Sequence, residues 1–188
     1  TIYEQPYLQG NVEGGEGYDW FYASAEDRAQ QIRTPITDGA AGKPWVYRYK
    51  DIRSWWSNQH YDRPGGVEAA TRTAWVPESK PIRFTEFGAP ALDRSANQPN
   101  VFLDPKSSES LLPYFSRGWR DDLMQRAYAE AWMLYWGAPG VNPQSSVHGG
   151  PMLERSEMAL WTWDGRPHPF FPALEEVWRD GANWRLGH

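Results

Sequence analysis

The most regular pattern of apolar and polar positions falls in residues 120–136, where apolar side chains recur every three to four residues. On a helix this spacing gathers them on one face. The stripe consists of Leu123, Ala127, Ala131, Leu134 and Tyr135. Asp121 and Asp122 suit the positive end of the helix dipole, and Gly137 and Pro139 are expected to end the helix. The pattern therefore predicts a long amphipathic helix over 120–136.

Three further helices are predicted from weaker signals. Residues 18–33 end in the strongly helix-forming run AEDRAQQIR, and either Asp19 or Ser24 is expected to cap them. A second helix is predicted over about 49–58, after a strand-like start at WVY. Its apolar positions follow helical spacing: Trp45, Tyr49, Ile52 and Trp56. A short final helix is predicted over 172–178.

Two short apolar runs have the character of buried strands. Residues 80–88, KPIRFTEFG, begin with Pro81, whose missing N–H is tolerated at the start of a strand. They present Glu86 at their end, and Gly88 permits a sharp exit with a close backbone approach. Residues 158–163, MALWTW, form the second run. Helices that alternate with short strands predict parallel βα units, and therefore an α/β fold.

Long irregular segments are predicted because Gly and Pro are frequent, with 17 and 16 residues. These segments cover 1–17, 34–44, 58–76 and 89–119. No repeat or linker divides the chain, so residues 1–188 are predicted to form a single domain or a domain fragment. Two strands cannot close a barrel, and the chain is expected to pack against sequence beyond it.

Length and composition limit the class of protein. The 188 residues are few for an eight-stranded α/β barrel of about 250 residues, and Thr1 in place of methionine predicts a piece of a longer polypeptide. The net charge of −5 argues against a nucleic-acid partner. No apolar run reaches the ~18 residues of a membrane-spanning helix, so no membrane insertion is expected. Cysteine is absent, which excludes disulfides and thiol chemistry.

Tryptophan is unusually abundant, with 12 residues. Indole rings either pack in a core or stack on flat ligands such as sugar rings, and about two to four are expected to face a ligand. No metal or other cofactor is predicted, because the four histidines are scattered without the spacing of a metal site.

Glu86 and Asp164 are the candidate catalytic pair, since each follows a predicted strand. The ends of adjacent strands lie about 5 Å apart, and glycoside hydrolysis needs two carboxyl groups about 5–9.5 Å apart. In many retaining glycosidases with an α/β barrel, a strand ending in Thr-Glu-aromatic-Gly carries the nucleophile. Alternatively, Glu86 is a solvated loop carboxylate or pairs with an arginine, and Asp164 pairs with Arg166 or caps a turn.

Other polar and aromatic groups offer weaker candidates. Trp161 and Trp163 point to the same face of their strand, which suits either a sugar platform or a core layer. In the Gly-rich run, Glu16 and Asp19 are free to approach a ligand. The HYDRP segment combines three groups that either bind an anion or form a satisfied surface cluster: His60, Asp62 and Arg63.

Several long runs together carry a family resemblance: PWVYRYKDIRSWWSNQHYDRPGG, WVPESKPIRFTEFGAPALD, NQPNVFLDPKSSESLLPYFSRGWRDD, LWTWDGRPHPFFP and VWRDGANWRLGH. They resemble the TIM-barrel-like domain of the large tail (host specificity) protein of gene transfer agents and related phage-like particles, the glycoside hydrolase/phage tail family. The resemblance is specific because it includes the loops. It implies that the chain is the C-terminal portion of a (β/α)8 TIM-barrel-like domain, with its last two strands.

The resemblance also implies a function and a set of site residues. The expected function is a glycoside hydrolase-like domain of a phage-like tail that acts at the cell envelope on a glycan such as peptidoglycan. Glu86 would be the nucleophile or base at the end of the seventh strand, and Asp164 would end the eighth. The acid/base glutamate of such enzymes ends the fourth strand, outside this chain. The implied substrate-binding residues are Trp161, Trp163, Arg63, Asn97 and Asn100.

The implied partners are cell-wall polysaccharide and other tail or baseplate proteins. The alternative function is a non-catalytic structural or receptor-binding domain of the baseplate. A buried Glu86 neutralised by an arginine favours that alternative, whereas an exposed Glu86 beside an exposed indole favours catalysis.

Overall fold

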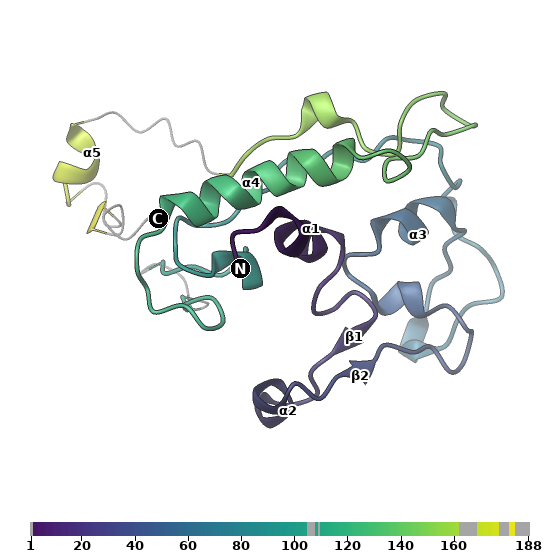
Figure 1. Ribbon diagram of the computed structural model, residues 1–188. Helices are drawn as coiled ribbons and strands as arrows, with labels where there is room; N and C mark the ends of the chain where they lie inside the picture. Colours follow the sequence, from purple (N-terminus) through teal and green to yellow (C-terminus); the bar gives the residue numbers. More distant parts are fainter. Residues whose placement is uncertain (1, 105–107, 109, 162–168, 177–180, 183–188) are drawn as a thin grey trace. The chain divides into compact units, whose positions relative to one another are not determined.

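A computed structural model describes residues 2–104, 108, 110–161, 169–176 and 181–182 (Figure 1). The chain divides into two compact units. Unit 1 comprises Thr1–Asn11, Arg83–Gly137 and Arg155–His188, and unit 2 comprises Val12–Ile82 and Ala138–Glu154. The two strands among the described residues, β1 (Trp20–Phe21) and β2 (Thr34–Pro35), pair antiparallel in unit 2.

Unit 1 is built on α4, Asp122–Gly137, which confirms the predicted long helix. The carboxylate of Asp121 caps it by accepting a hydrogen bond of 2.9 Å from the Met124 N–H. The buried face is rotated from the predicted stripe. It consists of Met124, Ala127, Tyr128, Ala131 and Trp136. Leu123 and Leu134, which the stripe included, are exposed, because Met124 and Tyr128 offer an equally regular apolar spacing.

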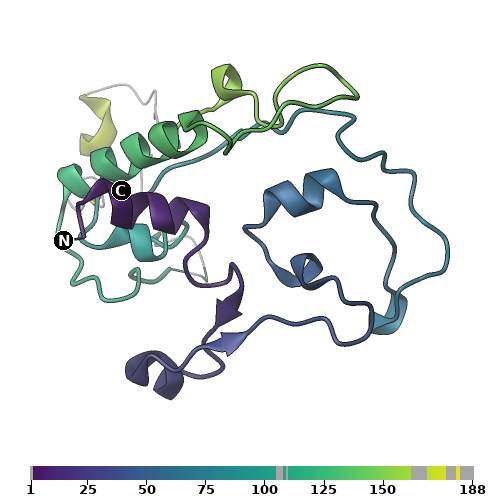
Figure 2. The ribbon, with the colours of Figure 1, turned by 45° about the vertical axis from the view of Figure 1, so that its right-hand side comes forward.

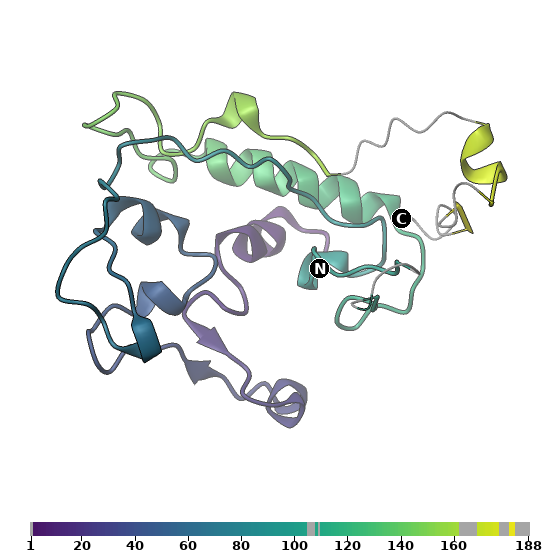
Figure 3. The same cartoon turned by 180° about the vertical axis from the view of Figure 1, so that it is seen from behind.

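An extended segment of unit 1, residues 83–88, lies along α4 (Figure 3). The rings of Phe84 and Phe87 lie 4.8 and 5.5 Å from the ring of Trp132 on the helix. The Gln125 side chain donates a hydrogen bond of 2.9 Å to the Ala89 carbonyl. Two aromatic contacts and one hydrogen bond therefore hold this segment against the helix.

The same segment pairs in parallel with residues 159–161, at the bridge between Phe87 and Leu160. Phe84 accepts a hydrogen bond of 3.0 Å from the Ala159 N–H, and the Phe87 N–H donates one of 3.0 Å to the Ala159 carbonyl. In a regular parallel ladder one residue lies between two such bonds. Here two residues lie between them, so the segment bulges at Thr85 and Glu86. Within unit 2, Ile82 and Leu153 form a second parallel bridge.

These bridges correct the prediction of two continuous buried strands. The bulge interrupts the ladder, and three side chains of the first segment are exposed: Arg83, Thr85 and Glu86. Parallel pairing of the two predicted segments is confirmed within unit 1 at one bridge. The mixture of helices and strands fits an α/β fold.

The long loop that follows Gly88 is organised around Asp93. Its carboxylate accepts hydrogen bonds from the Ser116 hydroxyl at 2.7 Å and from the N–H groups of Arg117 and Trp119, both at 3.0 Å. The loop buries small and apolar side chains: Ala89, Ala91, Leu92 and Ala96. The described part of the predicted loop 89–119 contains only a single 3-10 turn, η3 (Ser95–Asn97).

Asp93→Asn is expected to destabilise the protein by about 1–3 kcal/mol at neutral pH, because it removes charge-assisted hydrogen bonds. Burial opposes ionisation of Asp93, but the hydrogen bonds from Ser116, Arg117 and Trp119 hold its pKa below the usual value. A lowered folded-state pKa gives stability that is present above the unfolded pKa of about 3.9. That stability is lost as the pH falls through the folded-state pKa.

Urea unfolding measures this effect. The gap in unfolding free energy between wild type and Asp93→Asn should be widest at neutral pH and should narrow at about pH 3. Asp122→Asn is the control, because that side chain is 66% exposed and its ion pair is with the exposed Arg120. A gap that stays constant down to that pH would show that the charge of Asp93 does not stabilise the loop.

Unit 2 contains α2 (Ala25–Gln30) between β1 and β2, and α3 (Ile52–Ser57) (Figure 2). Ser24, one of the two predicted cap residues, caps α2 by accepting a hydrogen bond from the Asp27 N–H. The predicted helix 18–33 is wrong before Ala25, because the aromatic run at Trp20 favours a strand. The predicted helix 49–58 is confirmed in place but begins only at Ile52, where Asp51 caps it.

The remaining elements are short. The prediction of irregular structure over 1–17 is wrong, since α1 spans Gln5–Glu13 and buries Leu8 and Val12, four residues apart. The predicted final helix 172–178 is wrong for most of its described part: α5 spans Phe170–Ala173, residues 174–176 are not helical, and residues 177–178 lie outside the described residues. The other turns are 3-10 turns: η1 (Pro44–Tyr47), η2 (Pro64–Gly66) and η4 (Arg155–Glu157). Among the described residues no helix is both long and apolar enough to cross a membrane.

Candidate functional site

Glu86 lies in the bulge of unit 1, and its side chain is exposed. Within the described part of the chain, no group donates a hydrogen bond to its carboxylate and no arginine pairs with it. A bulge breaks the alternation of side chains and so changes the direction in which a residue points. The carboxylate is therefore presented to solvent at the end of a segment packed on α4.

The neighbouring segment brings Trp161 close to this bulge. The Trp161 N–H donates a hydrogen bond of 2.7 Å to the Phe87 carbonyl, and its half-buried ring lies 4.9 Å from the ring of Phe102. Gly88 adopts a φ of 138°, and a Cβ at this position would lie 2.5 Å from the Trp161 carbonyl oxygen. The predicted close approach at Gly88 is confirmed.

Two of the predicted site residues, Trp163 and Asp164, lie outside the described residues. Asn97 is committed to the loop: it accepts a hydrogen bond of 3.0 Å from the Tyr7 hydroxyl and donates one of 3.2 Å to the Tyr114 carbonyl. Asn100 is exposed. In unit 1 the structure therefore brings Trp161 to the Glu86 segment, whereas both ends of the Asn97 amide are occupied within the protein.

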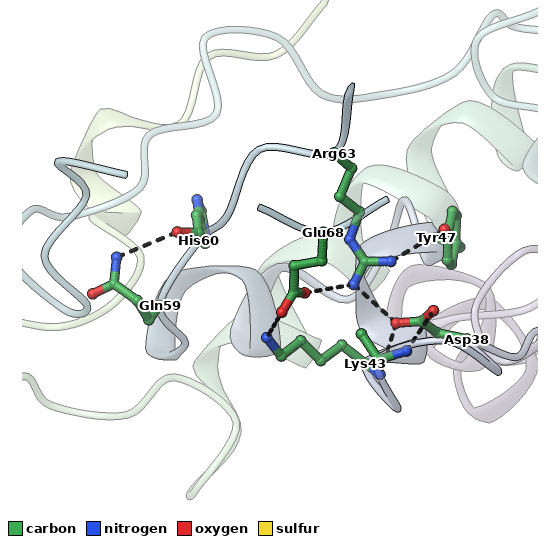
Figure 4. Close-up of polar contacts among 8 residues, drawn as sticks. Asp38, Lys43, Tyr47, Gln59, His60, Arg63 and Glu68 are labelled. Carbon is green, nitrogen blue, oxygen red and sulfur yellow. Dashed lines mark hydrogen bonds and ion pairs between the residues drawn. The ribbon is translucent and has the colours of Figure 1, made fainter. Parts of the chain in front are cut away.

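Arg63, the remaining predicted residue, belongs to a charge network in unit 2 (Figure 4). Its guanidinium lies 2.9 Å from a carboxylate oxygen of Asp38 and 2.9 Å from one of Glu68. Lys43 pairs with the other oxygen of Glu68 at 2.5 Å, and the Tyr47 hydroxyl accepts a hydrogen bond of 3.2 Å from Arg63. We call Asp38, Lys43, Arg63 and Glu68 the Arg63 network.

The Arg63 network is compact and largely closed to solvent. The side chains of Asp38 and Arg63 are 3% and 12% exposed. The hydrogen bond from Arg63 holds the pKa of Asp38 well below its usual range, so the carboxylate remains charged. Two cations are thus balanced by two anions. One interpretation of the sequence is a satisfied cluster of Arg63 with its neighbours His60 and Asp62, but Arg63 finds its ionic partners in Asp38 and Glu68.

A cavity of about 310 Å³ borders this network within unit 2. Its lining residues are Lys43, Trp45, Val46, Trp55, Gln59, His60, Tyr61, Asp62, Arg63, Glu68 and Thr73. The loop 59–73 closes on itself through hydrogen bonds from the Thr73 N–H to the His60 carbonyl and from the Ala69 N–H to the Asp62 carbonyl. Polar and aromatic groups from one loop and the segment before it therefore share one cavity.

Aromatic rings form one side of this cavity. The ring of His60 lies 4.7 Å from that of Trp55 and 5.7 Å from that of Trp45, and it stacks on Trp75 at 5.4 Å. A ring nitrogen of His60 lies 2.7 Å from the Trp55 carbonyl, which fixes the imidazole in place. The sequence pointed to His60, Asp62, Arg63 and to tryptophans in general. The contacts of Trp45 and Trp55 with the His60 ring depend on the folded loop.

The Gly-rich candidate has a structural explanation. The Glu16 carboxylate pairs with Arg28 at 2.5 Å, and its backbone carbonyl accepts a hydrogen bond of 2.8 Å from the Tyr49 hydroxyl. Asp19 is exposed. Among the described residues, no group of three or more histidine or acidic side chains is arranged to hold a metal ion.

The helices and the parallel bridges between short segments fit the class of α/β domains. The family model of the GTA TIM-barrel-like domain matches residues 1–172. The chain therefore belongs to the family of gene transfer agent TIM-barrel-like domains, and membership associates it with gene transfer agent particles. No curated protein sequence matches the chain.

Proposed function

We propose that this chain is part of a glycoside hydrolase-like domain in the tail of a gene transfer agent particle, where it cleaves a cell-envelope glycan such as peptidoglycan. The observation that carries the proposal is the exposed carboxylate of Glu86 in a bulge at the end of the segment 83–88. Catalytic groups of barrel enzymes lie at the ends of strands, and bulges are enriched next to active sites.

The chemistry divides between two carboxyl groups. Glu86 attacks the anomeric carbon or activates a water that does so, while the glycosidic bond breaks and a second carboxyl group protonates the leaving oxygen. We assign that second group to Asp164 or to a glutamate beyond this chain. Trp161 and Trp163 are proposed to stack on the sugar. In this proposal the paired segments 83–88 and 159–161 belong to the last two strands of the barrel.

The test is the release of reducing ends from purified peptidoglycan by the intact protein, with heat-denatured protein as the control. Release that depends on folded protein supports the proposal. A folded protein that cleaves neither peptidoglycan nor other envelope polysaccharides would overturn it.

A non-catalytic binding role in the baseplate is the second candidate function. Four large apolar side chains between residues 111 and 123 are at least 57% exposed: Leu111, Phe115, Trp119 and Leu123. Exposed apolar side chains that gather in one region mark protein contacts. Retained particle assembly without glycan cleavage would favour this role.

A further inference from the structure

The cavity in unit 2 is lined by charged and aromatic side chains that take no part in the catalysis proposed for Glu86. We infer that it binds a neutral, hydroxyl-rich sugar ring. This inference rests on the proposed function only for the choice of a glycan as ligand, since it requires binding and no cleavage.

The size and the aromatic side of the cavity suit a sugar. Its volume of about 310 Å³ lies at the small end of the range for ligand pockets, about 300–1,000 Å³. Trp55 is 47% exposed, and Trp45 also lines the cavity. An indole face offers a flat apolar surface, and the C–H face of a pyranose ring packs on such a surface.

The charges of the cavity argue against an anionic ligand. Lys43 pairs with Glu68, and Arg63 pairs with Glu68 and Asp38, so each cation of the lining already has an anionic partner. An incoming phosphate or carboxylate would have to displace one of these partners. Because Asp38 and Arg63 are both nearly buried, that exchange would leave a buried charge uncompensated.

Asp62 provides the polar contact that remains. Its side chain is exposed and lines the cavity, and no hydrogen bond or ion pair engages its carboxylate within the described ranges. A carboxylate accepts hydrogen bonds from hydroxyl groups, and bonds to a charged acceptor are the stronger kind. Trp55 would therefore hold the ring by its face, while Asp62 would hold its hydroxyls.

The experiment is titration calorimetry of the intact protein with two probes, the tetramer of N-acetylglucosamine and a tetramer of galacturonate. The first probe is neutral and the second is anionic. The neutral tetramer is expected to bind, and Trp55→Ala should weaken it by about tenfold or more, as for an aromatic anchor. Asp62→Asn should weaken it severalfold without affecting the fold, because the side chain is exposed and the change keeps its shape.

Two controls locate the binding. Trp119→Ala removes an indole of unit 1 that is 61% exposed, and Glu130→Gln removes an exposed carboxylate of unit 1 on α4. Both variants should bind the neutral tetramer as wild type does. Binding that Trp119→Ala weakens as much as Trp55→Ala does, or that neither Trp55→Ala nor Asp62→Asn changes, would overturn the inference. So would tighter binding of the galacturonate tetramer, or no binding of the neutral one.

The outcomes separate this inference from glycan cleavage. Binding without release of reducing ends would support the cavity as a carbohydrate-binding site and contradict the proposed hydrolase activity. Cleavage that persists in Trp55→Ala and Asp62→Asn, together with unchanged binding, would leave the hydrolase and remove the cavity as a sugar site.

Discussion

Glu86→Gln is expected to lower glycan cleavage by the intact protein about 10²–10⁴-fold, the range for a positioned acid–base group. Glutamine keeps the size of the side chain but is neither a base nor a nucleophile. The carboxylate is exposed and makes no hydrogen bond within the part of the chain that the structure describes. The substitution should therefore leave the unfolding free energy unchanged.

Initial rates of reducing-end release, with the melting temperature measured on the same samples, test this expectation. Glu130→Gln is the matched control, because Glu130 is also an exposed glutamate of unit 1 but lies on α4. It should retain full activity. Equal activity of the two variants would remove Glu86 from the mechanism even if the protein proves to be a glycosidase.

The long helix of this chain could be predicted because its signal is local and repeated. Residues 120–136 contain several turns of apolar spacing, and α4 follows within two residues at its start. The sequence does not decide which face of the helix is buried, because regularly spaced apolar stripes begin at both Leu123 and Met124. Phe84 packs against Trp136 of the buried face, with ring centres 5.9 Å apart, and that contact depends on distant sequence.

The short elements could not be predicted, because their sequence signals are neither long nor repeated. α1 begins with Gln-Pro and contains Gly10, so its composition favours a loop, yet Leu8 and Val12 both find a buried position. The bulge at Glu86 was equally invisible, because it is defined by two hydrogen bonds to Ala159. Seventy-two residues separate Ala159 from Phe87, and no local pattern encodes the register of such a pair.

The candidate site divides in the same way. Glu86 and Gly88 were predictable, since a strand-like run ending in Glu-Phe-Gly is a contiguous signal. Three residues that the sequence singled out line the cavity in unit 2: His60, Asp62 and Arg63. The role of Arg63 differs from the implied contact with substrate, because Asp38 and Glu68 occupy its guanidinium. Charge balance within a cluster is a property of the folded loop, because Asp38 lies far from Arg63 in sequence.

Gly88→Ala is expected to destabilise the protein by about 3 kcal/mol or more. A φ of 138° is strained for any residue with a Cβ, at a cost of about 1–3 kcal/mol. The added Cβ would also lie 2.5 Å from the Trp161 carbonyl oxygen, a backbone atom that can move only if the pairing with Phe87 opens. Such overpacking costs about 1–3 kcal/mol more.

Urea unfolding of Gly88→Ala beside Gly10→Ala isolates this effect. Gly10 lies inside α1 and no atom lies within 4 Å of its added Cβ, so alanine there should stabilise by about 0.5–1 kcal/mol. Gly88 also flanks the candidate site, since it follows Glu86 and Phe87. If the Gly88→Ala protein folds, the opening of the bridge between Phe87 and Leu160 should also lower glycan cleavage. An unfolding free energy equal to that of wild type would show that residues 159–161 do not approach Gly88, and the bulge that presents Glu86 would lose its basis.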